Sequence, residues 1–314
     1  MVLIETNDLT KHFGTLAAVE GVSLRVEAGE ILALLGPNGA GKTTTIRMLA
    51  SILRPTRGTA QINGFDVVQE SIEVRRSVGF LTEHHGLYTR MRPQEYLEFF
   101  GSIYKLATNV IRERTVDLLA QYGLSEASEL RLGQFSKGMR QKLIMIRALL
   151  HDPAVLLLDE PTSAMDPSSA HMVRESISGL RSTNRAIVVC THNLSEAEML
   201  ADTIAIILRG RIIALGTPNE LKQKLLGDPV MELRLAVSLD GALRCLPPGI
   251  KILDTGKNWL RYQIAQPEIV NPKVLQAMTE AGVKVVTLSE VERSLEDVYL
   301  QVVAEGENSR GREG

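Results

Sequence analysis

The sequence lacks the features that mark several large classes of protein. It has only two cysteines, too few for a disulfide framework or a four-cysteine zinc site, and this scarcity is typical of a reducing compartment. Its longest apolar stretches have the length of a strand, far below the roughly 20 residues that span a bilayer, so we expect no transmembrane segment. Residues 1–10 alternate polar and apolar side chains, which does not predict a signal peptide.

An excess of charge of one sign is also missing. The 35 lysines and arginines nearly balance the 37 aspartates and glutamates, and the formal net charge is −2. A chain without a positive excess has no long-range field that attracts a polyanion. We therefore do not expect nucleic acid as a partner.

The composition that remains is that of a globular protein. The chain has 314 residues, of which 44% are hydrophobic and 23% charged, enough for about two domains with buried cores. We predict an α/β domain over 1–226 and a small α+β domain over 229–303. Residues 304–314 consist largely of Glu, Gly, Ser and Arg without an apolar period, which predicts a disordered tail.

The first predicted domain combines three kinds of element. Alternating residues predict antiparallel strands at 2–9 and 22–26, with Gly14 and Gly21 as turn residues between them. Continuous apolar runs predict buried parallel strands. These runs are 30–35, 155–158, 186–190 and 204–208. A helical period that continues to residue 150 predicts a helical insertion over about 84–150.

A glycine-rich loop lies between the predicted strand at 30–35 and a predicted helix at 44–53. It fills the pattern G-x-x-x-x-G-K-[ST], and its candidate phosphate-binding residues are Gly36, Asn38, Gly39, Ala40, Gly41, Lys42, Thr43 and Thr44. Glycines let consecutive N–H groups turn toward an anion, and the helix N-terminus adds partial positive charge. Lys42 would reach the terminal phosphates and Thr43 would bind Mg²⁺. The alternative is an accidental glycine turn, which the flanking strand and helix disfavour.

Two carboxylates end the predicted strand at 155–158. Asp159 and Glu160 would lie at the carboxyl edge of the sheet, where α/β proteins bind ligands. Asp159 is a candidate Mg²⁺ ligand, and Glu160 is a candidate to orient or deprotonate an attacking water. Taken alone, the pair would more often be a solvated strand end, but the phosphate loop upstream favours the functional interpretation.

Further short motifs follow in a characteristic order. They are Phe13, the segment FSKGM at 135–139 with Ser136 and Gly138, the segment SAMD at 163–166, and His192 after the strand at 186–190. Together with the phosphate loop they resemble the motifs of an ABC transporter ATP-binding subunit, and the resemblance covers about 2–225. Taken singly, Phe13 would be a core residue and His192 a structural histidine.

The resemblance implies a role for each motif. Phe13 would stack on adenine, and His192 would contact the γ-phosphate beside the catalytic residues Lys42 and Glu160. Ser136 and Gly138, at the N-terminus of a helix, would bind phosphate held by a second copy of the chain. The family therefore implies ATP and Mg²⁺ as ligands, a P-loop NTPase fold and a homodimer whose two ATP sites are shared.

The sequence departs from the family pattern at three positions. Glu83 stands where the family usually has a glutamine that binds the metal, and a carboxylate can still bind Mg²⁺. Lys137 and Met139 replace the usual glycine and glutamine of the signature segment, although Ser136 and Gly138 are kept. Because Glu160 and His192 are both present, the resemblance implies a hydrolysing site rather than a binding-only one.

The resemblance also implies a membrane partner. A chain without a predicted span would need a separate transmembrane permease, which would place it on the cytoplasmic face of the membrane. The segment SLEDVYL at 294–300 resembles the accessory domain of subunits paired with type-2 exporters, which favours export. The alternative is a soluble ABC-type ATPase in regulation or repair. A GTPase or kinase would not explain Ser136 or His192.

Aromatic residues are concentrated near the candidate metal residue Glu83. Five of the thirteen aromatic residues lie between 88 and 104: Tyr88, Tyr96, Phe99, Phe100 and Tyr104. We predict a docking groove for the permease in this segment, with Tyr88 and Met91 as its candidates. For Phe100 and Tyr104 we favour the alternative, a place in the core of the helical insertion.

Overall fold

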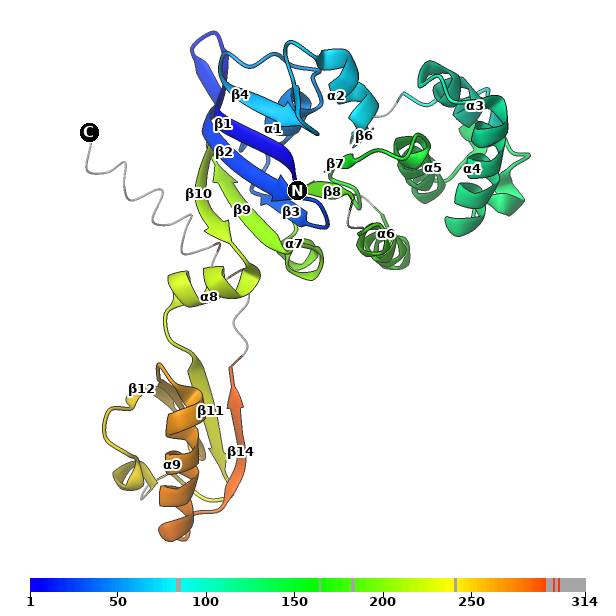
Figure 1. Cartoon of the computed structure of the whole chain (residues 1–314). Helices are drawn as coiled ribbons and strands as arrows, with labels where there is room; N and C mark the ends of the chain where they lie inside the picture. Colours follow the sequence, from blue (N-terminus) through cyan, green and yellow to red (C-terminus); the bar gives the residue numbers. More distant parts are fainter. Residues whose placement is uncertain are drawn as a thin grey trace. The chain divides into compact units, whose positions relative to one another are not determined.

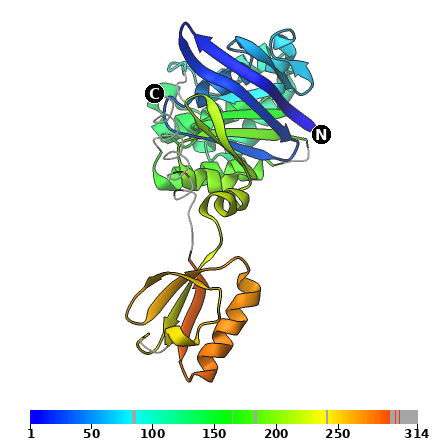
Figure 2. The same cartoon turned by 90° about the vertical axis from the view of Figure 1, so that its left-hand side faces the viewer.

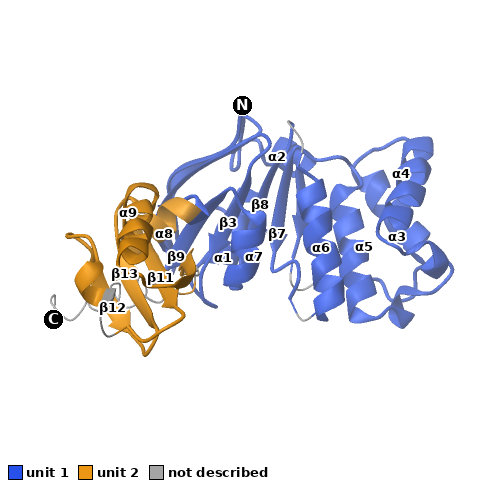
Figure 3. Ribbon diagram, turned by 90° about the horizontal axis from the view of Figure 1, so that it is seen from below, with its two compact units in different colours: residues 1–218 blue, residues 219–314 orange. Residues whose placement is uncertain are grey.

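The computed structural model describes residues 1–82, 86–163, 165–181, 184–239, 242–291, 296 and 299. The chain forms two compact units, Met1–Pro218 and Asn219–Gly314 (Figure 3). This division precedes the sequence-based boundary at 226, so helix α8 (Pro218–Leu226) falls largely in the second unit. Among the residues described, no helix combines the length and the apolar character that crossing a bilayer requires.

A four-stranded antiparallel sheet opens the first unit. Its strands, in the order β2-β1-β4-β5, are β1 (Val2–Phe13), β2 (Leu16–Glu27), β4 (Arg57–Ile62) and β5 (Phe65–Asp66). The β1–β2 hairpin is antiparallel as predicted, but both strands are longer than predicted. Register shifts along the hairpin interrupt the polar–apolar alternation, so the pattern underestimates their length. Gly21 lies inside β2 at a φ of 65° and is not a turn residue.

The second sheet of this unit has six strands in the order β10-β9-β3-β8-β7-β6. They are β3 (Ile31–Leu35), β6 (Val78–Leu81), β7 (Val155–Asp159), β8 (Ala186–Thr191), β9 (Thr203–Leu208) and β10 (Arg211–Gly216). β3, β7 and β8 run parallel and are buried along their whole length, which confirms the strands predicted there. Their carboxyl ends meet at one edge, where Leu35 pairs with Thr191 and Asp159 with Cys190.

Helices and the first sheet cover both faces of this central sheet. The helices outside the insertion are α1 (Lys42–Leu49), α2 (Ser71–Ser77), α6 (Pro167–Gly179) and α7 (Leu194–Leu200). Alternate strand residues enter two cores: Leu157 packs with α1 and the antiparallel sheet, whereas Leu156 and Leu158 pack with α6 and α7. α1 ends at Leu49, earlier than the predicted 53, because Ala50 and Ser51 leave the helical conformation and Ser51 has a φ of 53°.

The predicted helical insertion is confirmed. It contains α3 (Pro93–Ile103), α4 (Thr108–Gln121), the short 3₁₀ turns Ser125–Ala127 and Leu132–Gln134, and α5 (Lys137–Leu149). Figure 1 shows α3, α4 and α5 together at the end of the unit away from β1 and β2. Buried Tyr96, Leu119 and Leu143 join the three helices to the core that also holds Leu156 of β7. The insertion is therefore anchored to the central sheet by a shared core.

The second unit is a small α+β domain. Its elements after α8 are β11 (Val230–Leu235), the 3₁₀ turn Ala242–Cys245, β12 (Lys251–Thr255), β13 (Trp259–Gln263), α9 (Pro267–Glu280) and β14 (Val285–Glu290). The antiparallel sheet has the order β12-β13-β11-β14, and Figure 2 shows α9 running along it. Leu233, Leu260, Tyr262 and Val274 are completely buried and form the centre of its core.

Helix α9 contains two prolines. Pro267 occupies its first turn, and Pro272 lies inside the helix. Gly282 follows the helix at a φ of 72°. Further along the chain Glu296 and Tyr299 are helical, and the tail 304–314 lies outside the described residues.

Candidate nucleotide-binding site

The glycine loop joins β3 to α1 at the carboxyl edge of the central sheet. Gly39 and Gly41 have φ values of 80° and 111°, a region that residues with a side chain rarely adopt. A Cβ on Gly36 would lie 2.3 Å from the Ile207 carbonyl oxygen, and one on Gly41 would lie 2.6 Å from that of Ala18. The backbone therefore needs glycine at these positions, and it leads directly into the N-terminus of an eight-residue helix.

Lys42 is the first residue of α1, and its side chain turns back over the loop. Its Nζ donates hydrogen bonds to the carbonyl oxygens of Gly36 at 2.7 Å and Pro37 at 3.2 Å, and it lies 3.6 Å from Glu160 Oε1. The residue is only 5% exposed. A buried ammonium held by neutral carbonyls and one carboxylate is well placed to exchange the carbonyls for phosphate oxygens.

Thr43 and Asp159 bring two oxygen donors together. The Thr43 hydroxyl donates to Asp159 Oδ1 at 3.2 Å, although the residues are 116 positions apart in the chain. Asp159 is 2% exposed at the end of β7. A hydroxyl and a carboxylate fit the oxygen ligands that Mg²⁺ takes beside phosphate. Glu83, the third residue predicted for the metal, lies outside the described residues.

Glu160 lies between two basic side chains. His192 Nδ1 is 2.9 Å from each of its carboxylate oxygens, and the Lys42 ammonium is on the other side. Glu160 follows β7 and His192 follows β8, so neighbouring parallel strands bring them together. The carboxylate is almost completely buried, whereas the histidine side chain is about half exposed. The arrangement can hold a water beside an anion and accept its proton.

The FSKGM segment lies at the start of α5. Ser136 is the N-cap residue, and its Oγ accepts a hydrogen bond from the Met139 N–H at 3.2 Å. The helix N-terminus opens into a cavity of about 310 Å³. Its lining residues are Ser136, Lys137, Gly138, Met139, Lys142, Met165, Asp166 and Ser169. Among these described lining residues none comes from the phosphate loop, so the Ser136 segment and the loop do not line one cavity together.

Asp166, the last residue of the SAMD segment, shapes the other wall of this cavity. Its side chain caps α6 by accepting a hydrogen bond from the Ser169 N–H at 3.0 Å. Hydrogen bonds from Ser169 lower the pKa of the Asp166 carboxyl below its ordinary value. The carboxylate therefore keeps its charge and its capping role near neutral pH. Ala164, in the middle of the segment, lies outside the described residues.

Phe13 lies at the end of β1, away from both cores. Its side chain is 49% exposed, and Lys11 Nζ is 5.2 Å from the centre of its ring. A core role, the alternative weighed from the sequence, is therefore wrong for this residue. An exposed ring with a cation nearby suits stacking on a flat, electron-rich group such as a nucleobase.

Three polar residues beside this site are not predicted by the sequence. Gln141 Nε2 donates to the Pro161 carbonyl oxygen at 3.0 Å, and the Thr162 hydroxyl donates to Glu196 Oε1 at 2.6 Å. Gln141 is 7% exposed and Glu196 only 1%. For Gln141 and Glu196 the available signal is a polar residue at an inward position of an amphipathic helix, which composition alone does not distinguish from a surface residue.

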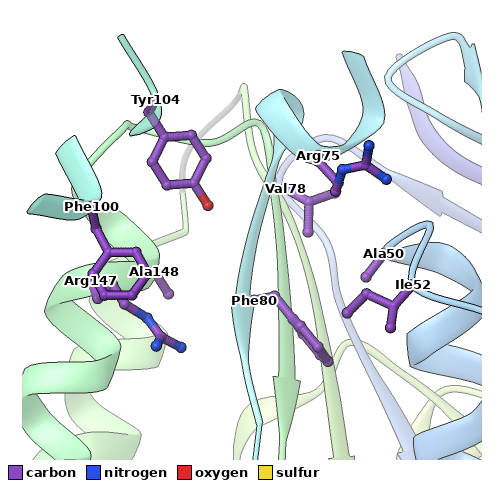
Figure 4. A pocket seen from close by; sticks show the side chains of 9 residues that line it. All are labelled: Ala50, Ile52, Arg75, Val78, Phe80, Phe100, Tyr104, Arg147 and Ala148. Atoms are coloured by element: carbon purple, nitrogen blue, oxygen red, sulfur yellow. The ribbon is translucent and has the colours of Figure 1, made fainter. Parts of the chain in front are cut away.

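A second cavity, of about 270 Å³, lies between the central sheet and the helical insertion (Figure 4). Its lining residues are Ala50, Ile52, Arg75, Val78, Phe80, Phe100, Tyr104, Arg147 and Ala148. Phe100 packs against the buried core of the insertion, as predicted, and both Phe100 and Tyr104 also line this cavity. Tyr104 is fixed by stacking on His151 with ring centres 3.8 Å apart, and Arg147 lies 5.0 Å from the centre of the Phe100 ring.

The two predicted groove residues lie elsewhere. Tyr88 is half exposed and meets the Phe99 ring edge to face, with centres 5.7 Å apart. Met91 packs against the buried core of the insertion. Neither lines the cavity of Figure 4. Phe100 and Tyr104 line that cavity instead, and the docking groove at Tyr88 and Met91 stays a prediction.

Comparisons with known proteins show which family the chain resembles. Residues 19–163 match the family model described as ABC transporter, and residues 216–303 match that of the ATP-binding protein DrrA1-3-like C-terminal domain. The daunorubicin resistance ATP-binding protein DrrA3 of Streptomyces coeruleorubidus is 34% identical over 311 residues, which cover 99% of this chain and 98% of that protein. The ABC transporter ATP-binding protein NatA of Bacillus subtilis is 39% identical over 224 residues, 70% of this chain and 91% of that protein.

A solved structure, an ATP-binding subunit of an ABC transporter, is also similar. It has 31% sequence identity to this chain and a TM-score of 0.67, and the match covers 72% of this chain and 94% of that one. The shared part has the size of the first unit. The DrrA3 match extends further and includes the second unit.

Proposed function

This chain belongs to the family of ABC transporter ATP-binding subunits, and from that premise we propose that two copies of it bind and hydrolyse ATP between them to drive a separate export permease. The chain is an ATP hydrolase with a P-loop NTPase fold. The relatives reported above are transporter or resistance proteins by name, and they give no support to the alternative of a soluble regulatory or repair ATPase.

The observation that carries the proposal is the convergence of Lys42, Glu160 and His192. The Glu160 carboxylate lies 3.6 Å from the ammonium and 2.9 Å from the imidazole nitrogen. Residues from three distant parts of the chain thus surround one small volume beside the glycine loop. Hydrolysis of a phosphoanhydride uses a cation that binds phosphate and a carboxylate that accepts the proton of the attacking water. Here an imidazole also lies beside that carboxylate.

Each residue has a proposed task in hydrolysis. The N–H groups of the glycine loop and the Lys42 ammonium hold the β- and γ-phosphates. Glu160 accepts the proton of the attacking water, and His192 holds that carboxylate and contacts the γ-phosphate. Thr43 and Asp159 would hold Mg²⁺, which neutralises phosphate charge when bound. Phe13 stacks on the adenine ring.

The second half of each site comes from the other copy. Ser136 and Gly138 lie at a helix N-terminus that opens into a cavity with two lysines and without phosphate-loop residues among its described lining. An anion bound by the partner's loop fits this cavity because the helix end and Lys137 are both positive. This complementarity supports a homodimer in which each chain completes the other's ATP site.

We place the permease contact at the cavity of Figure 4. Most of its lining side chains are apolar, among them Ala50, Val78 and Phe80. β6, which carries Phe80, ends two residues before Glu83, so this cavity adjoins the segment that precedes the predicted metal residue. A short apolar segment of a permease fits such a site, and this contact would hold the chain at the cytoplasmic face of the membrane.

A pair of matched substitutions tests this contact. Ile52 lines the cavity and is 58% exposed, whereas Ile72 on α2 is 59% exposed and does not line it. A new carboxylate at Ile52 meets the apolar partner segment and costs desolvation, so Ile52→Asp should reduce co-purification with a permease encoded by an adjacent reading frame by about tenfold or more. Affinity purification from detergent-solubilised membranes measures this.

Ile72→Asp is the control and should leave the complex intact. Both variants should hydrolyse ATP like the parent when purified alone, because neither side chain touches the nucleotide residues. Equal recovery of the permease with both variants would remove the cavity from the contact. If the parent chain recovers no membrane protein encoded by an adjacent reading frame, the proposal that it binds a separate permease is contradicted.

A further inference from the structure

The backbone at Glu160 is strained. Glu160 has a φ of 50°, which residues other than glycine seldom adopt, and it precedes Pro161, which restricts the conformation of the residue before it even further. Such a conformation persists only where the surrounding contacts hold it. The orientation of the catalytic carboxylate therefore depends on what holds the Glu160–Pro161 link.

Contacts from three directions hold this link. From β8, the Cys190 carbonyl accepts the Glu160 N–H at 2.9 Å. Within the turn that follows β7, the Ser163 N–H donates to the Glu160 carbonyl at 3.1 Å. From α7, buried Glu196 accepts the Thr162 hydroxyl. From α5, the side chain of Gln141 reaches the Pro161 carbonyl at 3.0 Å. The last contact is the one that ties the link to the helical insertion.

Gln141 lies on the same helix as Ser136, five residues further along, and its side chain is almost completely buried. A buried carbonyl that loses its donor is costly, so the hydrogen bond to Pro161 is favoured wherever α5 lies close enough. A shift of α5 would either carry the Pro161 carbonyl with it or break this bond. Both outcomes change the strained backbone that orients Glu160.

We propose that Gln141 is a positioning residue which, through Pro161, holds Glu160 of its own chain in the orientation for hydrolysis. This inference rests on the proposed function, because it gives Glu160 the role of the base. It has a consequence for the dimer. The N-terminus of α5 meets the nucleotide on the partner, so one hydrogen bond connects the partner's site to the base of the chain's own site.

The test replaces Gln141 with methionine, which has nearly the same length but no N–H donor. The kcat for ATP hydrolysis by the full-length chain should fall about tenfold, the size of effect that one lost buried hydrogen bond produces. The KM and the affinity for ATP should stay within about twofold, because Gln141 does not touch the phosphate loop. Gln121→Met, at an exposed position at the end of α4, is the control and should change neither value.

A double-mutant cycle separates positioning from a merely structural role. In a Glu160→Gln background, Gln141→Met should lower the residual rate by less than about twofold, since residues that act as a unit are not additive. An equal tenfold loss in both backgrounds, or a loss of ATP affinity, would overturn the proposal. If Gln141→Met does not fold, Gln141→Asn, which is too short to reach Pro161, enters the same cycle with the same expected results.

The two proposals fail in different ways. If the parent chain hydrolyses ATP and Glu160→Gln lowers the rate about a hundredfold or more, the proposed function stands whatever Gln141 does. If Glu160→Gln hydrolyses ATP at the parent rate, Glu160 is not the base, and the role proposed for Gln141 fails with it. A melting temperature for each variant, measured in the same buffer, shows whether a loss of rate follows from a loss of stability.

Discussion

Replacing Glu160 with glutamine should lower the rate of ATP hydrolysis by roughly two to four orders of magnitude while ATP binding is retained. The amide has nearly the same shape but cannot accept the proton of the attacking water. It also removes the negative charge that lies between Lys42 and His192. Steady-state hydrolysis and equilibrium binding, measured on the same preparation, test both halves of this expectation.

The same substitution should lengthen the life of the ATP-bound dimer. Without turnover, both nucleotides stay between the two chains and keep them together, so size-exclusion chromatography with ATP and Mg²⁺ should show a dimer. Glu113→Gln, the same change at an exposed position of α4, is the control and should turn over like the parent. Hydrolysis by Glu160→Gln within about twofold of the parent would remove Glu160 from the catalytic role.

Replacing Lys42 with alanine should weaken ATP binding itself. Truncating one member of a buried charge pair costs about 2 kcal/mol or more, which corresponds to at least about a thirtyfold loss of affinity. Without the ammonium, the carbonyls of Gly36 and Pro37 and the Glu160 carboxylate all face the phosphates with no cation among them. Isothermal titration calorimetry with ATP measures the change.

The control for Lys42 is Lys284→Ala, an exposed lysine of the second unit, which should leave ATP affinity unchanged. A Lys42→Met variant, which keeps the length of the side chain, should behave like Lys42→Ala if charge is what matters. Unchanged affinity in Lys42→Ala would mean that the loop N–H groups hold the phosphates alone, and the assigned role of Lys42 would be wrong.

Much of the first unit could be predicted because its signals are local. Strands β3, β7 and β8 are buried on both faces and therefore appear as continuous apolar runs. The ends of β1 and β2 were missed because register shifts along the hairpin remove the period that would mark them. A hydrophobic pattern predicts the full length of a strand or helix only where burial follows the same period from end to end.

The identities of several site residues could be predicted from motifs, but their side-chain contacts could not. Motifs predict Lys42, Glu160 and His192, and the structure places Lys42 at 3.6 Å and His192 at 2.9 Å from the Glu160 carboxylate. Gln141 and Glu196 were missed because burial of a polar side chain depends on what packs against its helix. For the same reason the sequence did not predict the cavity that Phe100 and Tyr104 line, because its other lining residues are 20 or more positions away in the chain.

The central claim is that each ATP site takes its phosphate loop from one chain and its Ser136 segment from the other. Mixed dimers of two differently tagged chains, purified through both tags, test it with Lys42→Ala and Ser136→Arg. In one arrangement both changes lie on the same chain, and in the other each chain carries one. ATP hydrolysis by the two arrangements is then compared.

If the sites are shared, the dimer with one change on each chain keeps one site free of both, whereas the dimer with both changes on one chain has damage in each site. We therefore predict that the dimer with one change on each chain hydrolyses ATP and that the dimer with both changes on one chain does not. The opposite order, with activity only when both changes lie on the same chain, would contradict the account.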